Sequence, residues 1–248
     1  MSGHSKWANI RRKKEVVDAV RGKVFTRLGK EITIAARQGG GDESTNPRLR
    51  TAILSAKGAN MPSTNIEKAI KKGLGTLEGV SYEEFVYEGY GPAGVAIIIE
   101  GVTDNKKRTV SEIRHLLTKH GGNLASSGSV SWMFETKGLI QIPCEGLDED
   151  DVMMHALDAG AEDFEKEDDH FEIITQPNDL FSVQEALTAL GYNVDSAQIQ
   201  KIPNDFTEVP QDDIAKVVKF LDVIDDQEDV QSMSASVNFT DEMLEGIE

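Results

Sequence analysis

The feature that most constrains the fold is a self-contained series of predicted elements in the second half of the chain. Apolar periodicity predicts, in order, strand, helix, strand, strand, helix and strand over Leu139–Ile142, Asp148–Ala159, Asp163–Lys166, His170–Thr175, Leu180–Leu190 and Ser196–Ile202. That βαββαβ order is typical of a ferredoxin-like domain. One helix (Asp212–Ile224) and one strand (Val230–Asn238) follow it, and they cannot bury a core alone. We therefore predict that they complete an earlier sheet, which makes residues 137–203 an inserted domain.

The earlier sheet is predicted from the residues before the insertion. Strand patterns cover Glu84–Tyr90, Val95–Glu100 and Ser129–Phe134. A helix capped by Asp104-Asn105 runs to His120 between the last two strands. Together with the elements after the insertion, these predict a discontinuous α/β domain formed by residues 79–136 plus 204–248.

Residues 1–78 have a different, helical pattern. Apolar residues recur at spacings of three and four along residues 16–37, and Gly39–Gly41 ends this first helix. Asn46-Pro47 begins a second helix, and Thr64-Asn65-Ile66-Glu67 resembles a capping box that opens a third. The predicted fold class is thus α+β and multidomain: a basic three-helix domain, then two α/β domains, both ferredoxin-like, the second inserted in the first.

Charge is divided unevenly along the chain. Residues 1–75 carry 16 Lys and Arg against 6 Asp and Glu, a net charge of +10. The whole chain has a net charge of −17, so the remaining residues carry −27. A basic segment on an acidic body is typical of a nucleic-acid-binding module. Repulsion, screened over about 8–10 Å, should keep a polyphosphate away from the acidic part. We therefore predict that nucleic acid contacts the N-terminal domain.

The candidate contacts are polar and cationic side chains of an N-terminal arm and of the first helix. They are His4, Ser5, Lys6, Trp7, Arg11, Arg12, Lys13 and Lys14 in the arm, and Arg21, Lys23, Arg27, Lys30 and Arg37 in the helix. Lys and Arg neutralise phosphates and release counterions. Two interpretations of Trp7 stay open. It stacks on an unpaired base, or it packs on the helices as a hydrophobic staple.

Other functional classes have little support in the sequence. The five histidines form no metal set, and Cys144 is the single cysteine. No nucleophile–base pair or phosphate loop stands out, so we expect no enzyme activity, no cofactor, no metal and no small-molecule substrate. The run Thr103 to Arg108 is interpreted as a helix cap with solvated cations rather than as a phosphate contact. The lone cysteine and the absence of a long apolar run predict a cytoplasmic protein without a membrane partner.

Several motifs resemble the YebC/PmpR family, which includes the mitochondrial translational activator of cytochrome c oxidase subunit I. They are Gly3-His4-Ser5-Lys6-Trp7-Ala8-Asn9-Ile10, Arg21-Gly22-Lys23-Val24-Phe25, Asn46-Pro47-Arg48-Leu49-Arg50, Ala59-Asn60-Met61-Pro62, Tyr87-Glu88-Gly89-Tyr90-Gly91-Pro92 and Lys119-His120-Gly121-Gly122-Asn123-Leu124. The motifs occur in the family's order along nearly the whole chain. The resemblance implies a three-domain fold with the same insertion.

The resemblance also implies a nucleic-acid-linked regulator of gene expression, and it leaves the target open. Family members are described as transcriptional regulators that bind promoter DNA. They are also described as ribosome-associated translation factors that relieve stalling at proline-rich stretches, which would make ribosomal RNA the target. A short third helix and a cationic arm with one Trp suit irregular RNA better than a paired DNA half-site. A third interpretation is a protein-interaction scaffold that works through its ferredoxin-like domain.

Overall fold

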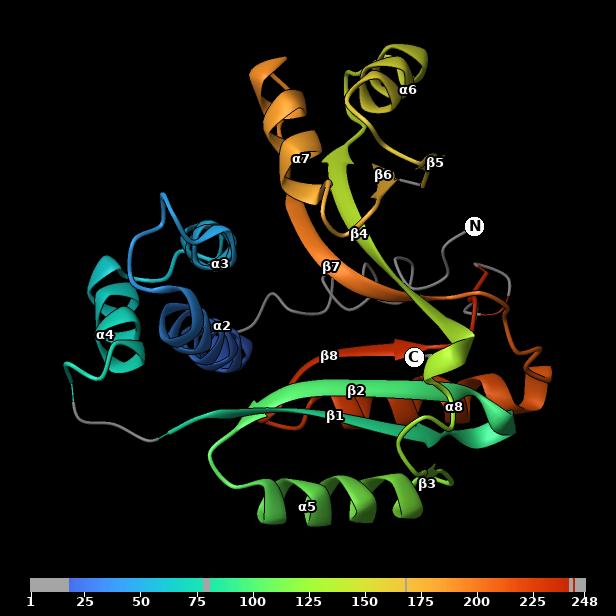
Figure 1. The fold of residues 1–248 in the computed structure, drawn as a ribbon. Helices are drawn as coiled ribbons and strands as arrows, with labels where there is room; N and C mark the ends of the chain where they lie inside the picture. Colours follow the sequence, from blue (N-terminus) through green and yellow to red (C-terminus); the bar gives the residue numbers. More distant parts are fainter. Residues whose placement is uncertain (1–17, 78–80, 168, 241–242, 244–248) are drawn as a thin grey trace. The chain divides into compact units, whose positions relative to one another are not determined.

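The computed structural model describes residues 18–77, 81–167, 169–240 and 243 (Figure 1). These residues form seven α-helices and two four-stranded sheets, so the chain is α+β with a helical region ahead of the sheets, as predicted. The chain divides into two compact units, one of Glu135–Ile202 and one of the residues on either side. The helical region and the first sheet share a unit, so the three predicted domain boundaries stay predictions.

Three helices make up the described part of the N-terminal region: α2 (Asp18–Gly39), α3 (Pro47–Gly58) and α4 (Ser63–Gly73). Their apolar faces meet in one small core built around Ile32, Leu49 and Ile53. Asn46 caps α3 as predicted, because its side chain accepts a hydrogen bond from the Leu49 N–H at 3.1 Å. The predicted capping box is wrong. Helix α4 begins two residues earlier, after Pro62 rather than Thr64, and no side chain caps it.

The first sheet has the strand order β3-β1-β2-β8. Its strands are β1 (Glu83–Tyr90), β2 (Ala96–Thr103), β3 (Asn123–Leu124) and β8 (Val230–Ala235), and its helices are α5 (Lys106–Lys119) and α8 (Gln211–Asp225). Strand β8 pairs antiparallel with β2, so the elements after the insertion do complete this sheet. Both helices pack on one face of the sheet, against Ile97 and Ile99 of β2. Ile98, between them in the strand, lies on the opposite face.

One strand predicted for this sheet does not form. Residues 131–133 are a short 3-10 helix, η2 (Ser131–Met133), and the strand that follows begins only at Phe134. The backbone N–H groups of Gly128, Val130 and Ser131 all donate to the carboxylate of Glu88. Because these donors are used by a side chain, they cannot join a β-ladder.

The inserted unit matches the predicted series closely. It contains β4 (Phe134–Pro143), α6 (Glu149–Asp158), β5 (Asp163–Lys166), β6 (His170–Thr175), α7 (Leu180–Ala189) and β7 (Ser196–Pro203). The strand order is β5-β6-β4-β7, in which the first and third strands are central, as the ferredoxin-like pattern requires. Helices α6 and α7 cover one face and share a core with Ile140, Ile142 and Phe171.

The two sheets share one spatial plan. In each, a strand–helix–strand unit (β2-α5-β3 or β4-α6-β5) leaves a gap between its strands, and a single strand (β1 or β6) fills it. The last strand, β8 or β7, then pairs with the outer side of the first. The only difference is that β1 precedes its unit in the chain, whereas β6 follows. The sheet that receives the insertion is therefore ferredoxin-like, except that β1, the strand between β2 and β3, comes first in the chain instead of after β3.

Candidate nucleic-acid interface

The structure describes only part of the predicted contact set. The eight arm residues lie outside the described residues: His4, Ser5, Lys6, Trp7, Arg11, Arg12, Lys13 and Lys14. Arg21 lies on α2, as predicted, and its side chain is not among those described. Lys23, Arg27, Lys30 and Arg37 also lie on α2, and their side chains are described.

The four described cations of α2 all contact the α/β part of the same unit. Lys23 lies 3.2 Å from a carboxylate oxygen of Asp226, and Arg27 lies 3.3 Å from one of Asp225. Lys30 lies 2.7 Å from Asp229. Arg37 donates to the carbonyl oxygen of Tyr82 at 2.7 Å. Three of the four therefore pair with an acidic segment that begins at the end of α8, although the Lys23 side chain is still 52% exposed.

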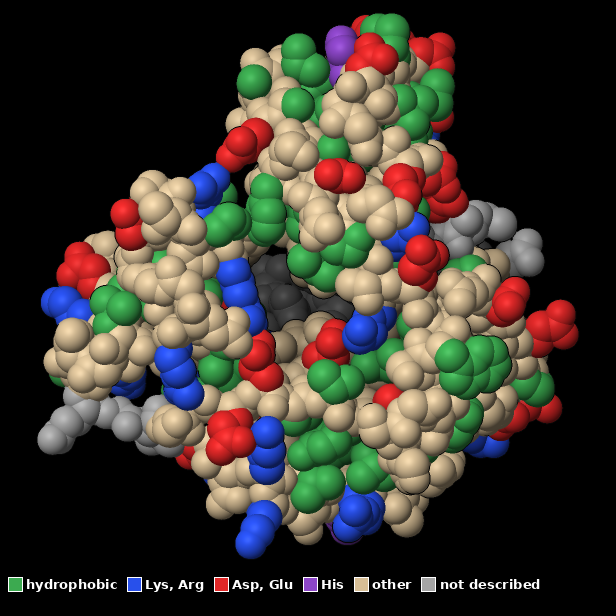
Figure 2. Space-filling view, in the orientation of Figure 1, with side chains coloured by type: hydrophobic (Ala, Val, Ile, Leu, Met, Phe, Trp, Pro, Cys, Tyr) green, Lys and Arg blue, Asp and Glu red, His purple; other side chains and the backbone are tan. Residues whose placement is uncertain are grey.

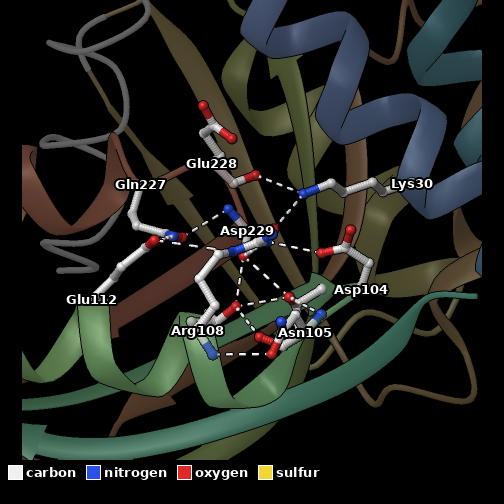
Figure 3. Close-up of polar contacts among 10 residues, drawn as sticks. Lys30, Asp104, Asn105, Arg108, Glu112, Gln227, Glu228 and Asp229 are labelled. Atoms are coloured by element: carbon white, nitrogen blue, oxygen red, sulfur yellow. Dashed lines mark hydrogen bonds and ion pairs between the residues drawn. The ribbon is translucent and has the colours of Figure 1, made fainter. Parts of the chain in front are cut away.

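Asp229 is the centre of the most buried of these contacts, which we call the Asp229 cluster (Asp229, Lys30, Arg108, Thr103 and Thr109). Figure 3 shows Lys30 extending from α2 toward Asp229, with Arg108 of α5 on the other side. Asp229 is 2% exposed, and its carboxylate accepts hydrogen bonds from all four partners at 2.6–3.1 Å. Lys30 also donates to the Glu228 carbonyl and is only 8% exposed. In this structure Lys30 is thus not available to a phosphate.

The local sequence explains why Arg108 meets Asp229. Asn105 caps α5 by accepting from the Arg108 N–H at 3.1 Å, and its own N–H donates to the Thr103 hydroxyl. The cap fixes the first turn of the helix, and Asp104 holds the Arg108 guanidinium at 2.8 Å. The interpretation of residues 103–108 as a helix cap is therefore confirmed. The expectation that the cations of this run are solvated is wrong for Arg108 and for Lys106, which pairs with Glu83 at 3.1 Å.

The cluster shifts the titration of its carboxylate. Burial raises the pKa of Asp229, but hydrogen bonds from Lys30, Thr109 and Arg108 outweigh it and lower the pKa to about 2. An unfolded Asp has a pKa near 3.9, so the folded state holds the ionised form more strongly. This difference stabilises the fold by roughly 2 kcal/mol above about pH 4, and the stabilisation is lost as the pH falls toward 2.

We expect this loss to be visible as an acid-dependent difference between two proteins. The free energy of unfolding should fall more between about pH 6 and pH 2.5 for the wild type than for Asp229→Asn, by roughly 2 kcal/mol. Urea titrations at both pH values measure it. Equal falls in the two proteins would show that Asp229 ionises in the fold as it does in the unfolded chain.

A second set of cations, which the sequence analysis did not select, is exposed on the helical region. Lys57 lies in the last turn of α3, and Lys68, Lys71 and Lys72 lie on α4. All four are exposed, and no carboxylate among the described residues lies within ion-pair distance of them. In Figure 2 the Lys and Arg side chains of the helical region are seen at the left of the view. The sequence feature that could have identified this set is the Lys68-x-x-Lys71-Lys72 spacing, which places the three lysines on one side of a helix.

The described residues contain one group with the spacing of metal ligands. Carboxylate oxygens of Glu165, Glu167 and Glu172 lie within 4.8 Å of one another on β5 and β6 and the turn between them. The register explains the group, because Glu165 lies directly opposite Glu172. One oxygen of Glu172 accepts from Gln141 at 2.9 Å. Among the described helices, none combines the length and apolar character that crossing a bilayer requires.

Comparison with known proteins identifies the family. Residues 5–76 match the TACO1/YebC protein N-terminal domain, and residues 82–237 match the TACO1/YebC second and third domain. A probable transcriptional regulatory protein of Persephonella marina is 52% identical over 249 residues, covering 100% of both chains. One of Dictyoglomus turgidum is 51% identical over 248 residues, also with 100% coverage of both.

A solved structure agrees with the fold. The crystal structure of a conserved hypothetical protein from Aquifex aeolicus is 46% identical and superposes with a TM-score of 0.86. The match covers 92% of this chain and 94% of that chain. Together with the two domain matches and the full-length relatives, this confirms the resemblance seen in the motifs. The chain belongs to the TACO1/YebC family.

Proposed function

We propose that this chain is a nucleic-acid-binding regulator of gene expression that contacts phosphates through its N-terminal region. The observation that carries the proposal is the set of exposed lysines on α3 and α4 (Lys57, Lys68, Lys71 and Lys72), which lack carboxylate partners among the described residues. The names of the relatives, probable transcriptional regulatory proteins, support a role in gene expression.

The pairing of charges within the fold supports this surface over the one predicted first. Arg27 and Lys30 of α2 pair with buried carboxylates of the acidic segment, so they have little net charge left for phosphates, whereas the Lys23 pair is exposed to solvent. The lysines of α4 keep their full charge. Each can displace condensed counterions from a nucleic acid, which is the main source of affinity without sequence preference. The arm residues Arg11 to Lys14 would add to the same effect.

The kind of nucleic acid follows from what these side chains recognise. Lysines contact phosphates and carry no base-reading pattern, so the described surface suits a target recognised by shape and charge. Structured RNA, such as ribosomal RNA, is that kind of target, and a translation factor at the ribosome would use it. The names of the relatives favour DNA and transcription instead. Binding to phosphates is common to ribosomal RNA and DNA, and this is the binding that we propose. The experiments below distinguish the two targets.

Removing the lysines of α4 should weaken binding and flatten its salt dependence. We expect Lys68→Ala/Lys71→Ala/Lys72→Ala to lower the slope of log K against log salt by about 0.7–0.9 for each lost phosphate contact. Arg11→Ala/Arg12→Ala/Lys13→Ala/Lys14→Ala should act in the same way. Fluorescence anisotropy with duplex DNA and with a ribosomal RNA fragment, over a series of salt concentrations, measures both variants.

A matched control is available on α5. Lys107, Arg114 and Lys119 are exposed there, and changing all three to Ala removes the same charge from the α/β part of the unit. This variant should bind as the wild type does. If it loses as much affinity as the α4 variant, the effect is one of net charge and the proposed surface is wrong.

In-cell crosslinking with sequencing of bound RNA and bound DNA separates the targets. Crosslinks to ribosomal RNA that depend on the arm would identify a translation factor, and discrete promoter peaks would identify a transcriptional regulator. A protein that binds neither nucleic acid would instead be a protein-interaction scaffold.

A further inference from the structure

Helix α6 of the inserted unit carries a stripe of exposed apolar side chains on its outer face. The stripe consists of Met153, Met154 and Leu157, with Leu147 just before the helix. Met154 and Leu157 are 50% and 47% exposed. The spacings of three and four place Met153, Met154 and Leu157 on one side of the helix, between its middle and its C-terminal end. In Figure 2, hydrophobic and acidic side chains alternate over this part of the inserted unit, at the top of the view.

The fold does not need this stripe. The inner side of α6 is anchored by Val152 and Ala156, which are fully buried in the core of the unit. His155 beside them lies 2.7 Å from the Tyr192 hydroxyl. Single exposed apolar residues are ordinary on protein surfaces, but a continuous stripe at helical spacing marks a surface that a partner covers.

The chain segment that carries the stripe is acidic, although Lys166 of β5 pairs with Glu149 in the first turn of α6 at 2.8 Å. Residues 144–163 contain eight Asp and Glu and not a single Lys or Arg. Asp148 caps the helix, and the helix dipole accounts for the acids of the first turn. It does not account for Asp158, which lies in the last turn, where a negative charge is unfavourable. The apolar stripe therefore runs through an anionic field.

We propose that this α6 surface binds a cationic amphipathic helix of a partner protein. An amphipathic helix offers apolar side chains at the same spacing, and Lys or Arg beside them would meet Asp150 and Asp158. The two methionines can adapt to the shape of the partner. Nucleic acid and an anionic membrane surface are repelled by this face. A second copy is repelled too, because a two-fold contact would bring two acidic faces together.

A peptide of stated chemistry tests the proposal on the full chain. The probe is a synthetic Leu/Lys peptide with an apolar face, and the comparison is a scrambled peptide of the same composition. The wild type should bind the amphipathic peptide at least tenfold more tightly than the scrambled one. Met153→Gln/Met154→Gln/Leu157→Gln should weaken binding at least tenfold. Leu190→Gln, which changes another exposed leucine of the same unit, should leave binding unchanged.

The charge is tested separately. Asp150→Asn/Asp158→Asn should weaken binding and reduce its salt dependence, whereas Asp179→Asn at the start of α7 should not. Equal affinity for the two peptides, or an unaffected triple variant, would overturn the proposal. So would a wild type that dimerises in analytical ultracentrifugation while the triple variant is monomeric, since a second copy would then be the occupant. Melting curves check that the variants fold. None of these outcomes depends on nucleic-acid binding, because the surface lies in the inserted unit.

Discussion

Replacing Asp229 with alanine should lower the free energy of unfolding by about 3–5 kcal/mol, the range seen when one partner of a buried ion pair is removed. The carboxylate is the shared acceptor for Lys30, Arg108 and two threonine hydroxyls. Without it, the Lys30 ammonium keeps the Glu228 carbonyl and the face of the Tyr82 ring, 6.0 Å away, but no carboxylate, while its side chain is 9% exposed. Urea unfolding followed by circular dichroism measures the loss.

Asp226 provides the matched control for Asp229. It lies three residues earlier and pairs with Lys23 at 3.2 Å, but its side chain is 69% exposed. Water already solvates this pair, so Asp226→Ala should change the stability by less than about 1 kcal/mol. If the two variants lose the same stability, burial does not decide the strength of the contacts between α2 and the acidic segment.

Replacing Glu88 with alanine is expected to cost about 3 kcal/mol or more. Its carboxylate accepts from the backbone N–H groups of Gly128, Val130 and Ser131 at 2.7, 2.7 and 3.0 Å. Burial raises the pKa of Glu88, yet these three donors outweigh it and leave the pKa below its ordinary value. Each donor left unsatisfied in a buried site costs about 1–3 kcal/mol, although water would reach some of them. Thermal and urea unfolding measure the effect.

Two further variants test the reason for this loss. Glu88→Gln keeps the size of the side chain but only one acceptor oxygen, so its stability should lie between those of the wild type and Glu88→Ala. Glu83→Ala on the same strand removes an exposed carboxylate that pairs with Lys106, and it should have little effect. A Glu88→Ala protein as stable as Glu83→Ala would mean that the 128–131 turn holds its conformation without the carboxylate.

Most of the fold could be predicted from local patterns. The βαββαβ series and the Asn46 and Asn105 caps depend on residues close together in sequence, so periodicity and capping preferences are sufficient. The wrong strand at 129–134 shows the limit. Its alternation is strand-like, but Glu88, about forty residues earlier, takes the N–H groups that a strand would use. Local pattern cannot register a side chain that competes from a distance.

The candidate interface was predictable only in part. Charge asymmetry along the chain places the basic residues in the N-terminal region, and this follows from the sequence alone. Which of those cations are available to a phosphate is decided by residues about 200 positions away, where Asp225, Asp226 and Asp229 meet α2. The position of Lys30 in the helical pattern of the sequence would be the same whether its side chain faced water or a buried carboxylate. The sequence pattern alone therefore cannot tell the two apart.

The sequence by itself thus determined most of the elements, their order, the insertion and the basic end of the chain, because these depend on neighbouring residues and on summed charge. The tertiary structure alone decided that the acidic segment neutralises α2, that the lysines of α4 remain exposed, and that the outer face of α6 has no covering element among the described residues. The physical reason is range. Periodicity and capping act within a few residues, whereas pairing and exposure depend on which distant surfaces the fold brings together.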